Sequence, residues 1–315
     1  MLVTCPQCGA KVSANQHVVR RAAFAQAHER VWPAHASDAT NASERSVKVG
    51  DRVVRLLAQL ARGESGDVFL GERVGPFAER FTVHVAHDSV SAKCHDAAVS
   101  ALCALQTSTA ATAPFFTTYL PQVTAVGIDH RLHGEARAVL LLRHPPDYWG
   151  GLNRVLTYNT GGIDARHVLW MGARCLDLLG FIHASGWTHG ALSLDHLLVQ
   201  PQDHAMMFVG WSQARPSGAD AAARARDVSM LARSLRRLIS TASDAATEPK
   251  LRDDVPAPLA ELLARMSEDP AWVMHTDATA LRDALMQSAA QSFGARKFIV
   301  FNPRSARPAV TNADF

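Results

Sequence analysis

The stretch that decides the fold is HASGWTHGALSLDHLLV, which runs from His183 to Val199. It directly follows a run in which apolar residues recur at helical spacing behind Asp164, a residue type that often caps a helix N-terminus. The apolar residues of that run are Val168, Met171, Cys175, Leu176, Leu179 and Ile182. The pattern predicts a helix that ends at His183 and feeds a loop. A buried helix–strand unit of an unrelated α/β domain would also fit this stretch alone.

The loop after the predicted helix resembles the catalytic loop of the eukaryotic-type protein kinases. That family has His-Arg/Gly-Asp, then a Lys two residues and an Asn five residues after the Asp. The Asp accepts the proton of the substrate hydroxyl, and the Asn helps to hold metal. Here the frame survives as His189-Gly190-Ala191. The Asp position is Ala191, the Lys position is Ser193 and the Asn position is His196.

A glycine turn between the first two predicted strands resembles the phosphate loop of the same family. The family pattern Gly-x-Gly-x-x-Gly-x-Val keeps two of its glycines here, Gly63 and Gly66, and its Val, Val68. Glycine turns between strands are common, so the support comes from the position of this one in the chain. The resemblance implies a degenerate nucleotide loop at these residues.

The third predicted strand lacks the lysine that grips the nucleotide phosphates in the family. The aligned position is His84, and a neutral imidazole cannot supply the same fixed cation. The next helix, predicted over residues 89–106, contains no Glu to pair with such a lysine. Its facing positions are alanines and its one acid is Asp96; the alanines are Ala97, Ala98 and Ala101.

The metal-binding Asp-Phe-Gly of the family is expected about fourteen residues after the Asn position. The window reads Phe-Val-Gly-Trp-Ser, in which Gly210 takes the Asp place and Trp211 the aromatic place. Mg²⁺ needs oxygen ligands, and this window has no carboxylate. Asp195 and Asp203 are nearby in sequence, but the first is one residue out of register and the second lies in a predicted turn.

The segment that follows is short. Asp227 lies only 17 residues after Gly210, and it resembles the Asp that begins the central C-lobe helix of kinases. No Ala-Pro-Glu triplet, the usual end of the peptide-substrate platform, occurs between them. The framework positions His189 and Asp227 are therefore kept, whereas the positions of the family's catalytic and ligand-binding residues are replaced.

The resemblance covers about residues 48–290 and implies an α+β, bilobal protein-kinase-like fold. The predicted parts are an N-terminal segment and linker (1–45), a β-rich N-lobe (46–144), a helical C-lobe (145–292) and a C-terminal tail (293–315). Predicted strands cover 53–61, 67–73, 81–86, 122–133 and 137–142, and further helices begin near 227, 259 and 278. The tail contains a strand-like FIVF at 298–301.

The N-terminal segment carries a candidate zinc knuckle, Cys5-Pro-Gln-Cys8. The spacing suits zinc, but a complete site needs two further ligands and no second cysteine pair follows. His28 and His35 are the favoured partners, with His17 as another candidate. A degenerate ribbon without metal, or a site completed by a second chain, remains open. The other three cysteines are scattered and do not suggest a disulfide framework.

Composition favours a soluble, cytoplasmic protein. Of the 315 residues, 48% are hydrophobic and 19% charged, which allows a sizeable core. No apolar run is long enough for a membrane helix. The N-terminus reaches polar residues too early for a signal peptide. The basic residues concentrate at the two ends of the chain, which is either ordinary surface charge or a contact with an acidic partner.

The resemblance, with the replaced positions, implies a pseudokinase: a protein-binding, scaffold or regulatory module without phosphoryl transfer, and not an enzyme. ATP with Mg²⁺ is expected to bind weakly or not at all, and a protein is the expected partner. One alternative is a divergent kinase-fold transferase that has re-sited its catalytic residues. A second alternative is an adaptor whose zinc-ribbon end contacts nucleic acid or protein.

Overall fold

The structure is a computed structural model of residues 1–315. It describes residues 2–4, 11–13, 19–20, 45–74, 77–130, 135–143, 148–241, 250–295 and 297–305. The chain divides into two compact units, which we call the sheet unit (1–103 and 121–147) and the helical unit (104–120 and 148–315). The predicted order of a strand-rich N-terminal part and a helical C-terminal part is confirmed.

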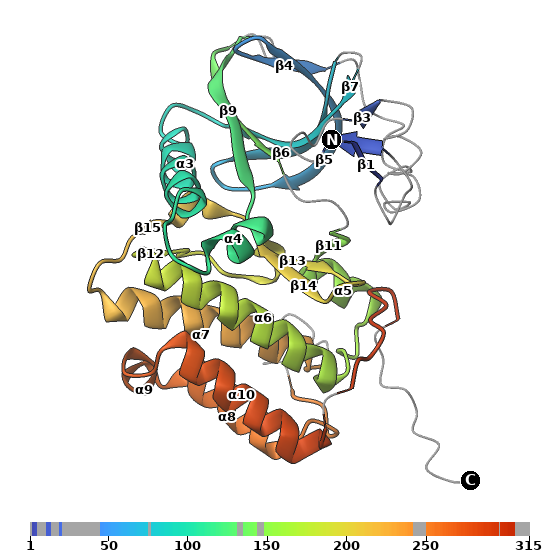
Figure 1. The fold of residues 1–315 in the computed structure, drawn as a ribbon, viewed down its shortest axis with the longest axis vertical. Helices are drawn as coiled ribbons and strands as arrows, with labels where there is room; N and C mark the ends of the chain where they lie inside the picture. The colour runs from blue at the N-terminus through green and yellow to red at the C-terminus, as the bar shows by residue number, and fades with distance from the viewer. Residues whose placement is uncertain are drawn as a thin grey trace. The chain divides into compact units, whose positions relative to one another are not determined.

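The sheet unit is built on one antiparallel sheet of six strands, in the order β4-β5-β6-β8-β10-β9 (Figure 1). Their bounds are β4 Ser46–Val49, β5 Arg52–Arg62, β6 Gly66–Arg73, β8 Arg80–Ala86, β9 Gln122–Asp129 and β10 Arg137–Arg143. The short strands β1 (Leu2–Thr4) and β2 (Lys11–Ser13) pair with each other, and β3 (Val19–Arg20) pairs with β7 (Phe77–Ala78). Five strands match the predicted ranges closely; β4 was not assigned from the sequence.

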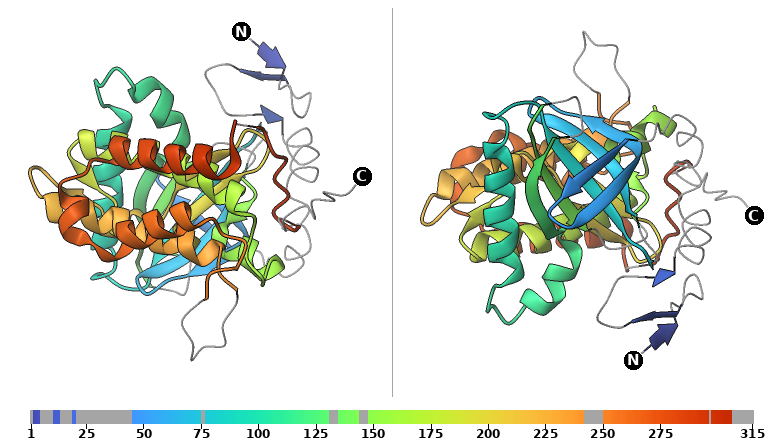
Figure 2. Two further views of the ribbon diagram at one scale, coloured as in Figure 1. Left: turned by 90° about the horizontal axis from the view of Figure 1, so that it is seen from below. Right: turned by 90° about the horizontal axis from the view of Figure 1, so that it is seen from above.

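The six-stranded sheet curls until its two outer strands approach each other (Figure 2). The backbone N–H of Lys48 in β4 donates to the carboxylate of Asp129 in β9 at 2.7 Å. Arg52 donates to the carbonyl of Thr124 at 3.3 Å. Alternating apolar side chains fill the interior, as the two-residue period of a strand requires: Val47, Val49, Val54, Leu56, Phe81, Val83, Val85, Val139 and Leu141.

Helix α3 (Lys93–Gln106) begins four residues later than the sequence predicts. The carboxylate of Asp88 accepts the N–H of Ser91 at 2.7 Å, and the N–H of Ala92 bonds back to the Asp88 carbonyl. An aspartate that bonds the backbone ahead of it stabilises a turn at the expense of a helix. The Asp88 turn therefore delays the start of the helix.

The helical unit is organised around four long helices (Figure 1). Helix α6 packs on α7 and α10, and α8 packs on the same two helices. They are α6 Ala165–Ala184, α7 Ala221–Leu238, α8 Ala257–Glu268 and α10 Ala278–Phe293. Shorter elements are α4 Ala113–Phe116, η2 Thr117–Tyr119, α5 Leu152–Tyr158 and α9 Pro270–Met274. A three-stranded sheet (β11 Gly150–Gly151, β13 Leu197–Gln200, β14 Ala205–Phe208) and the pair β12 (Trp187–Thr188) with β15 (Arg215–Pro216) complete the unit.

Two helix starts show how the sequence sets the boundaries. Asp164 caps α6 as predicted, by accepting the N–H of Arg166 at 2.8 Å. Helix α7, however, begins at Ala221, where Asp220 is the cap and accepts the N–H of Ala223 at 2.9 Å. Asp227 therefore lies in the second turn of α7, and the expectation that it begins this helix was wrong.

Two further sequence expectations need comment. The strand-like residues 298–301 form no strand in the described part of the chain. The structure also contains no described helix long and apolar enough to cross a bilayer.

Candidate functional site

The loop from β12 to β13 is held in place by one buried carboxylate, that of Asp227. Its side chain is fully buried and accepts the backbone N–H groups of His189 (2.9 Å) and Gly190 (2.7 Å). The Nε2 of His183, at the end of α6, lies 3.1 Å from the same carboxylate. Asp227 therefore fixes the loop between two of the long helices.

The side chain of His189 ties this loop to the segment after β14. Its Nε2–H donates to the carbonyl of Val209 at 3.0 Å, and its Nδ1 accepts the N–H of Ala191 at 3.3 Å. Because Nδ1 accepts a hydrogen bond, the ring is neutral. Burial lowers the pKa of His189 to about 4, despite the opposing charge of Asp227. The neutral imidazole is fully buried, and its one N–H proton is bonded to the Val209 carbonyl, so its role here is to hold the loop.

The position expected to hold metal, Gly210, is occupied by the ring of a neighbour. Gly210 has left-handed backbone angles (φ 79°), and a Cβ added to it would lie 2.5 Å from Nε2 and 2.6 Å from Cγ of His196. The His196 ring is held there because its Nδ1–H donates to the carbonyl of Ala191. Backbone pairing adds a further constraint, since the N–H of Val209 donates to the His196 carbonyl at 2.9 Å. Two positions predicted to have lost their ligands, 196 and 210, are thus packed against each other.

Trp211 takes part in the core of the helical unit. Its side chain is 2% exposed, and its indole N–H donates to the carbonyl of Phe208 at 2.8 Å. Its ring packs against His189 with 4.7 Å between centroids. The residue in the aromatic place therefore supports the loop from inside.

The two acids that remained as alternatives both have structural partners. Asp195 lies in a short 3-10 helix and accepts the side-chain N–H of Asn153, which is in α5. Asp203 lies in the turn between β13 and β14, where its carboxylate accepts the amide of Gln200 at 3.0 Å and its N–H donates back at 2.8 Å. These bonds orient both carboxylates toward neighbouring elements of the helical unit.

In the sheet unit, the predicted nucleotide loop is a tight hairpin turn. Gly66 lies so close to β8 that an added Cβ would be 2.5 Å from the carbonyl oxygen of Val85. His87 reaches the turn from β8, because its N–H donates to the Ser65 carbonyl at 3.1 Å. Gly63 closes the turn through a bond to the Gly66 carbonyl at 2.9 Å, and Val68 pairs with His84 across β6 and β8. The close approach of β6 to β8 by itself explains why position 66 is a glycine.

His84 occupies the middle of β8, where the family has its lysine. Its ring meets the ring of His95 in α3 edge to face, with 6.5 Å between centroids. Burial lowers the pKa of His95, so this ring is neutral near pH 7. Alanines were predicted on this face of α3, and His95 was not among the predicted residues. His95 lies three residues before Ala98 and therefore shares its face of the helix, so the spacing could have indicated it.

The predicted zinc ligands Cys5, Cys8, His28 and His35 lie outside the described residues. The strands on either side of the Cys5–Cys8 motif, β1 and β2, are described and pair antiparallel. Among the described residues, no three His, Cys, Asp or Glu side chains come together in a group that could hold a metal ion. The zinc site stays a prediction.

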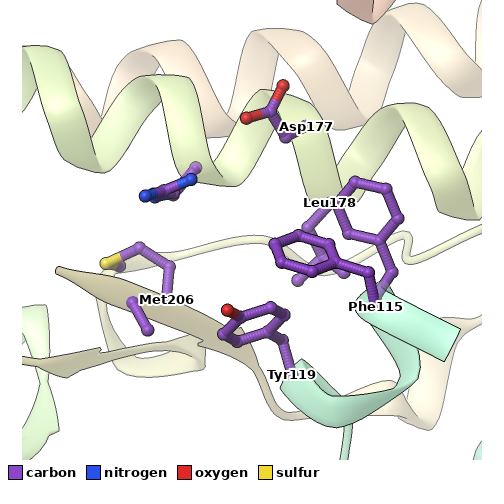
Figure 3. Close-up of a pocket in the computed structure, with 8 residues that line it drawn as sticks. Phe115, Tyr119, Asp177, Leu178 and Met206 are labelled. Atoms are coloured by element: carbon purple, nitrogen blue, oxygen red, sulfur yellow. The ribbon is translucent and has the colours of Figure 1, made fainter. Parts of the chain in front are cut away.

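The helical unit has a small pocket between η2, α4, α6 and β14 (Figure 3). Its lining is mainly apolar and aromatic, with Arg174 and Asp177 contributed by α6: Phe115, Phe116, Tyr119, Arg174, Asp177, Leu178, Ala205 and Met206. Phe116 stacks on Phe181 at 5.3 Å, which anchors α4 to α6. None of the predicted catalytic positions lines this pocket.

Two buried histidines are expected to make the stability of the protein sensitive to acid. Burial lowers the pKa of both His189 and His167 to about 4. An unfolded histidine titrates near 6.5, so between about pH 6.5 and pH 4 the unfolded chain binds more protons and stability falls as pH falls. For His189 alone we expect a loss of up to about 3 kcal/mol. Urea unfolding from pH 7 to 4.5 measures this.

Two variants test the origin of that acid sensitivity. His167→Phe should flatten the pH dependence, because it removes one buried titrating ring. His275→Gln is the control, because His275 is exposed and its removal should leave the slope unchanged. Equal slopes in all three proteins would show that buried imidazoles do not cause the effect.

Comparison with known proteins gives a likeness in structure alone. No protein-family model matches the chain, and no curated protein matches it. The crystal structure of the BubR1 kinase domain matches with a TM-score of 0.55 over 79% of this chain and 83% of that one, at 12% sequence identity. The fold is that of a protein kinase domain. The kinase domain of PF14_0431 matches with a TM-score of 0.45 over 60% of this chain and 63% of that one, at 12% identity.

Proposed function

We propose that this kinase-fold protein is a pseudokinase, which binds protein partners and does not transfer phosphate. The observation that carries the proposal is the packing of His196 against Gly210. In the kinase resemblance these are the two metal-holding positions. Here one carries an imidazole, and the other has no room for a side chain while that imidazole stays in place.

Physical reasoning supports the loss of chemistry at the remaining positions. Phosphoryl transfer depends on positioning and on charges that stabilise the transferred group. The base position is Ala191, and the strand position for a phosphate-gripping lysine is His84, whose neighbour on α3 is a neutral His95. Replacing buried charges by small or neutral groups also removes the cost of burying them without a ligand.

Nucleotide binding gives the direct test. We expect 1 mM ATP to raise the melting temperature little, and Mg²⁺ to add nothing, because the metal positions supply no carboxylate. If the Mg·ATP concentration were about 100 times its Kd, binding would raise the free energy of unfolding by about 2.7 kcal/mol. The melting temperature would then rise by several degrees. Differential scanning fluorimetry with ATP, with and without Mg²⁺, measures the difference. A strong Mg²⁺-dependent shift contradicts the proposal.

A second assay addresses a transferase with re-sited residues. Transfer of labelled phosphate or nucleotide from ATP to the protein itself or to bulk protein should be absent. Transfer that is lost in Asp195→Asn or Asp203→Asn would favour that alternative. The bonds of these two acids to Asn153 and Gln200 support a structural role for both.

A further inference from the structure

The chain segment after α10 lies along the helical unit beside α5 (Figure 1). Two of its residues are buried there, Phe301 with 4% exposure and Pro303. The surface that receives them is formed by the end of α5, the first turns of α6 and the turn between β13 and β14. We call residues 297–304 the tail segment and this surface the tail groove.

Aromatic rings hold the first half of the tail segment. Phe301 contacts the rings of His167 and Trp170 at centroid distances of 4.9 and 5.8 Å. Phe298 stacks on His204 at 4.4 Å with a 16° angle between planes, and His204 stacks on Trp170 at 4.1 Å and 3°. Phe298, His204 and Trp170 therefore form a continuous stack, in which Phe298 of the tail segment is an outer ring. Phe301, three residues later, is the second aromatic anchor of the tail segment.

The groove residues are fixed by bonds that do not involve the tail segment. The indole N–H of Trp170 donates to Nδ1 of His167 at 3.3 Å. Arg174 donates from Nε to the carbonyl of His204 at 3.2 Å, which steadies a residue with a left-handed backbone (φ 50°). The stacked rings of the groove are therefore positioned by α6 and by the β13–β14 turn themselves.

The second half of the tail segment is held by one hydrogen bond and one ring contact. The buried side chain of Asn159 donates from Nδ2 to the carbonyl of Pro303 at 2.8 Å. The guanidinium of Arg304 lies 5.8 Å from the centre of the Tyr158 ring. Pro303 is buried, and a proline suits this position because it has no N–H that burial would leave unpaired.

The tail segment is attached through side chains of the helical unit, those of Asn159 and of the aromatic rings. In the described part of the chain, its backbone makes no hydrogen bond to the backbone of the groove. Gly294, directly after α10, has φ 72° and open space around it. Phe298 and Val300 remain 70% and 79% exposed on the outer side. Segments held by few buried contacts open at low free-energy cost.

We propose that the tail groove is a peptide-docking site that the chain fills with its own tail segment. The ligand it fits is an extended peptide with two aromatic residues three positions apart and a proline two positions after the second, as in Phe298, Phe301 and Pro303. A partner protein with such a segment binds by displacing the tail. The inference deepens the proposed binding role, and it does not depend on the absence of phosphoryl transfer.

A competition experiment in the full chain tests the proposal. The probe is a fluorescein-labelled peptide, KFIVFNPRS, which copies residues 297–305. The wild-type groove is occupied at the millimolar effective concentration typical of a short tether, so the probe should bind it poorly. Phe301→Ala removes the buried tail anchor and leaves the groove intact. Fluorescence anisotropy should therefore show binding to this variant at least tenfold tighter.

Controls separate docking from loss of structure. Phe293→Ala, at the exposed end of α10, should bind the probe like the wild type. A probe with alanine at the Phe301 position should bind neither protein. Phe298→Ala is a second variant with an exposed anchor, and it should also bind the probe more tightly, by a smaller factor.

Two outcomes would overturn the proposal. One is a folded Phe301→Ala protein, judged by circular dichroism, that fails to bind the probe. The other is equal binding by wild type and variant, which would place the probe elsewhere. Failure of the pseudokinase proposal is separate, because it would appear as a Mg²⁺-dependent ATP shift without changing the peptide titration.

Discussion

Gly210→Ala is expected to lower the free energy of unfolding by about 3 kcal/mol. Two costs combine in this variant. The left-handed backbone at Gly210 disfavours any side chain with a Cβ by about 1–2 kcal/mol. The new methyl group would also stand inside the imidazole of His196, whose Nε2 and Cγ lie 2.5 and 2.6 Å from the Cβ position. Gly210→Asp should cost at least as much, because its longer side chain needs the same space.

Gly186→Ala is the matched control. Gly186 has φ 81°, nearly the angle of Gly210, yet its Cβ position has no neighbour within 4 Å. Its substitution should therefore cost only about 1–2 kcal/mol, the backbone term alone. Chemical denaturation of both variants isolates the collision with His196. Equal losses in the two variants would show that His196 moves aside at no cost.

The double variant His196→Ala/Gly210→Ala measures the coupling. Removing the His196 ring should restore about 2 kcal/mol of the free energy of unfolding that Gly210→Ala loses. This difference is the interaction energy of a double-mutant cycle. Such coupling would mean that one substitution cannot restore a carboxylate at position 210. In the pseudokinase proposal, the two metal positions changed into a packing contact that now contributes to the stability of the loop.

The sequence predicted the framework of this loop because a few residue types are tied to strong local rules. Asp164 before an apolar helical stripe predicts a cap, and the structure places it as the cap of α6. The resemblance to the protein kinases picked out His189 and Asp227 as framework positions, and Asp227 does accept the N–H of His189. Two motif residues that lie 38 positions apart predict a long-range contact, which a single short pattern cannot do.

Contacts without such rules were missed. Helix α7 begins at Ala221, earlier than predicted, because Asp220 caps it; the apolar pattern gives no sign of this cap. Helix α3 begins late because of the Asp88 turn, and the contact of His95, in its first turn, with His84 was not predicted. The stack of Phe298, His204 and Trp170 joins residues from three separate parts of the chain. No periodicity connects such residues, since only the folded backbone places them side by side.

Asp227→Asn is expected to destabilise the protein by about 3 kcal/mol or more. The two oxygens of Asp227 share three donors: Oδ1 accepts the N–H of Gly190, and Oδ2 accepts the N–H of His189 and faces Nε2 of His183. An amide has one oxygen, so either orientation turns an NH₂ group toward a buried N–H donor. Hydrogen bonds to a charged acceptor contribute about 1.5–3 kcal/mol each, and a buried donor left unpaired adds a further cost.

Asp220→Asn makes the comparison specific, because it is the same chemical change on the same helix. Asp220 accepts one N–H as the cap of α7, and asparagine caps a helix about as well as aspartate. We expect this control to change stability by less than about 0.5 kcal/mol. Urea unfolding of the two variants reports the difference. If both variants lose equally little, the loop does not depend on the Asp227 carboxylate. If only Asp227→Asn is strongly destabilised, the retained framework residue stabilises the fold independently of any catalytic role.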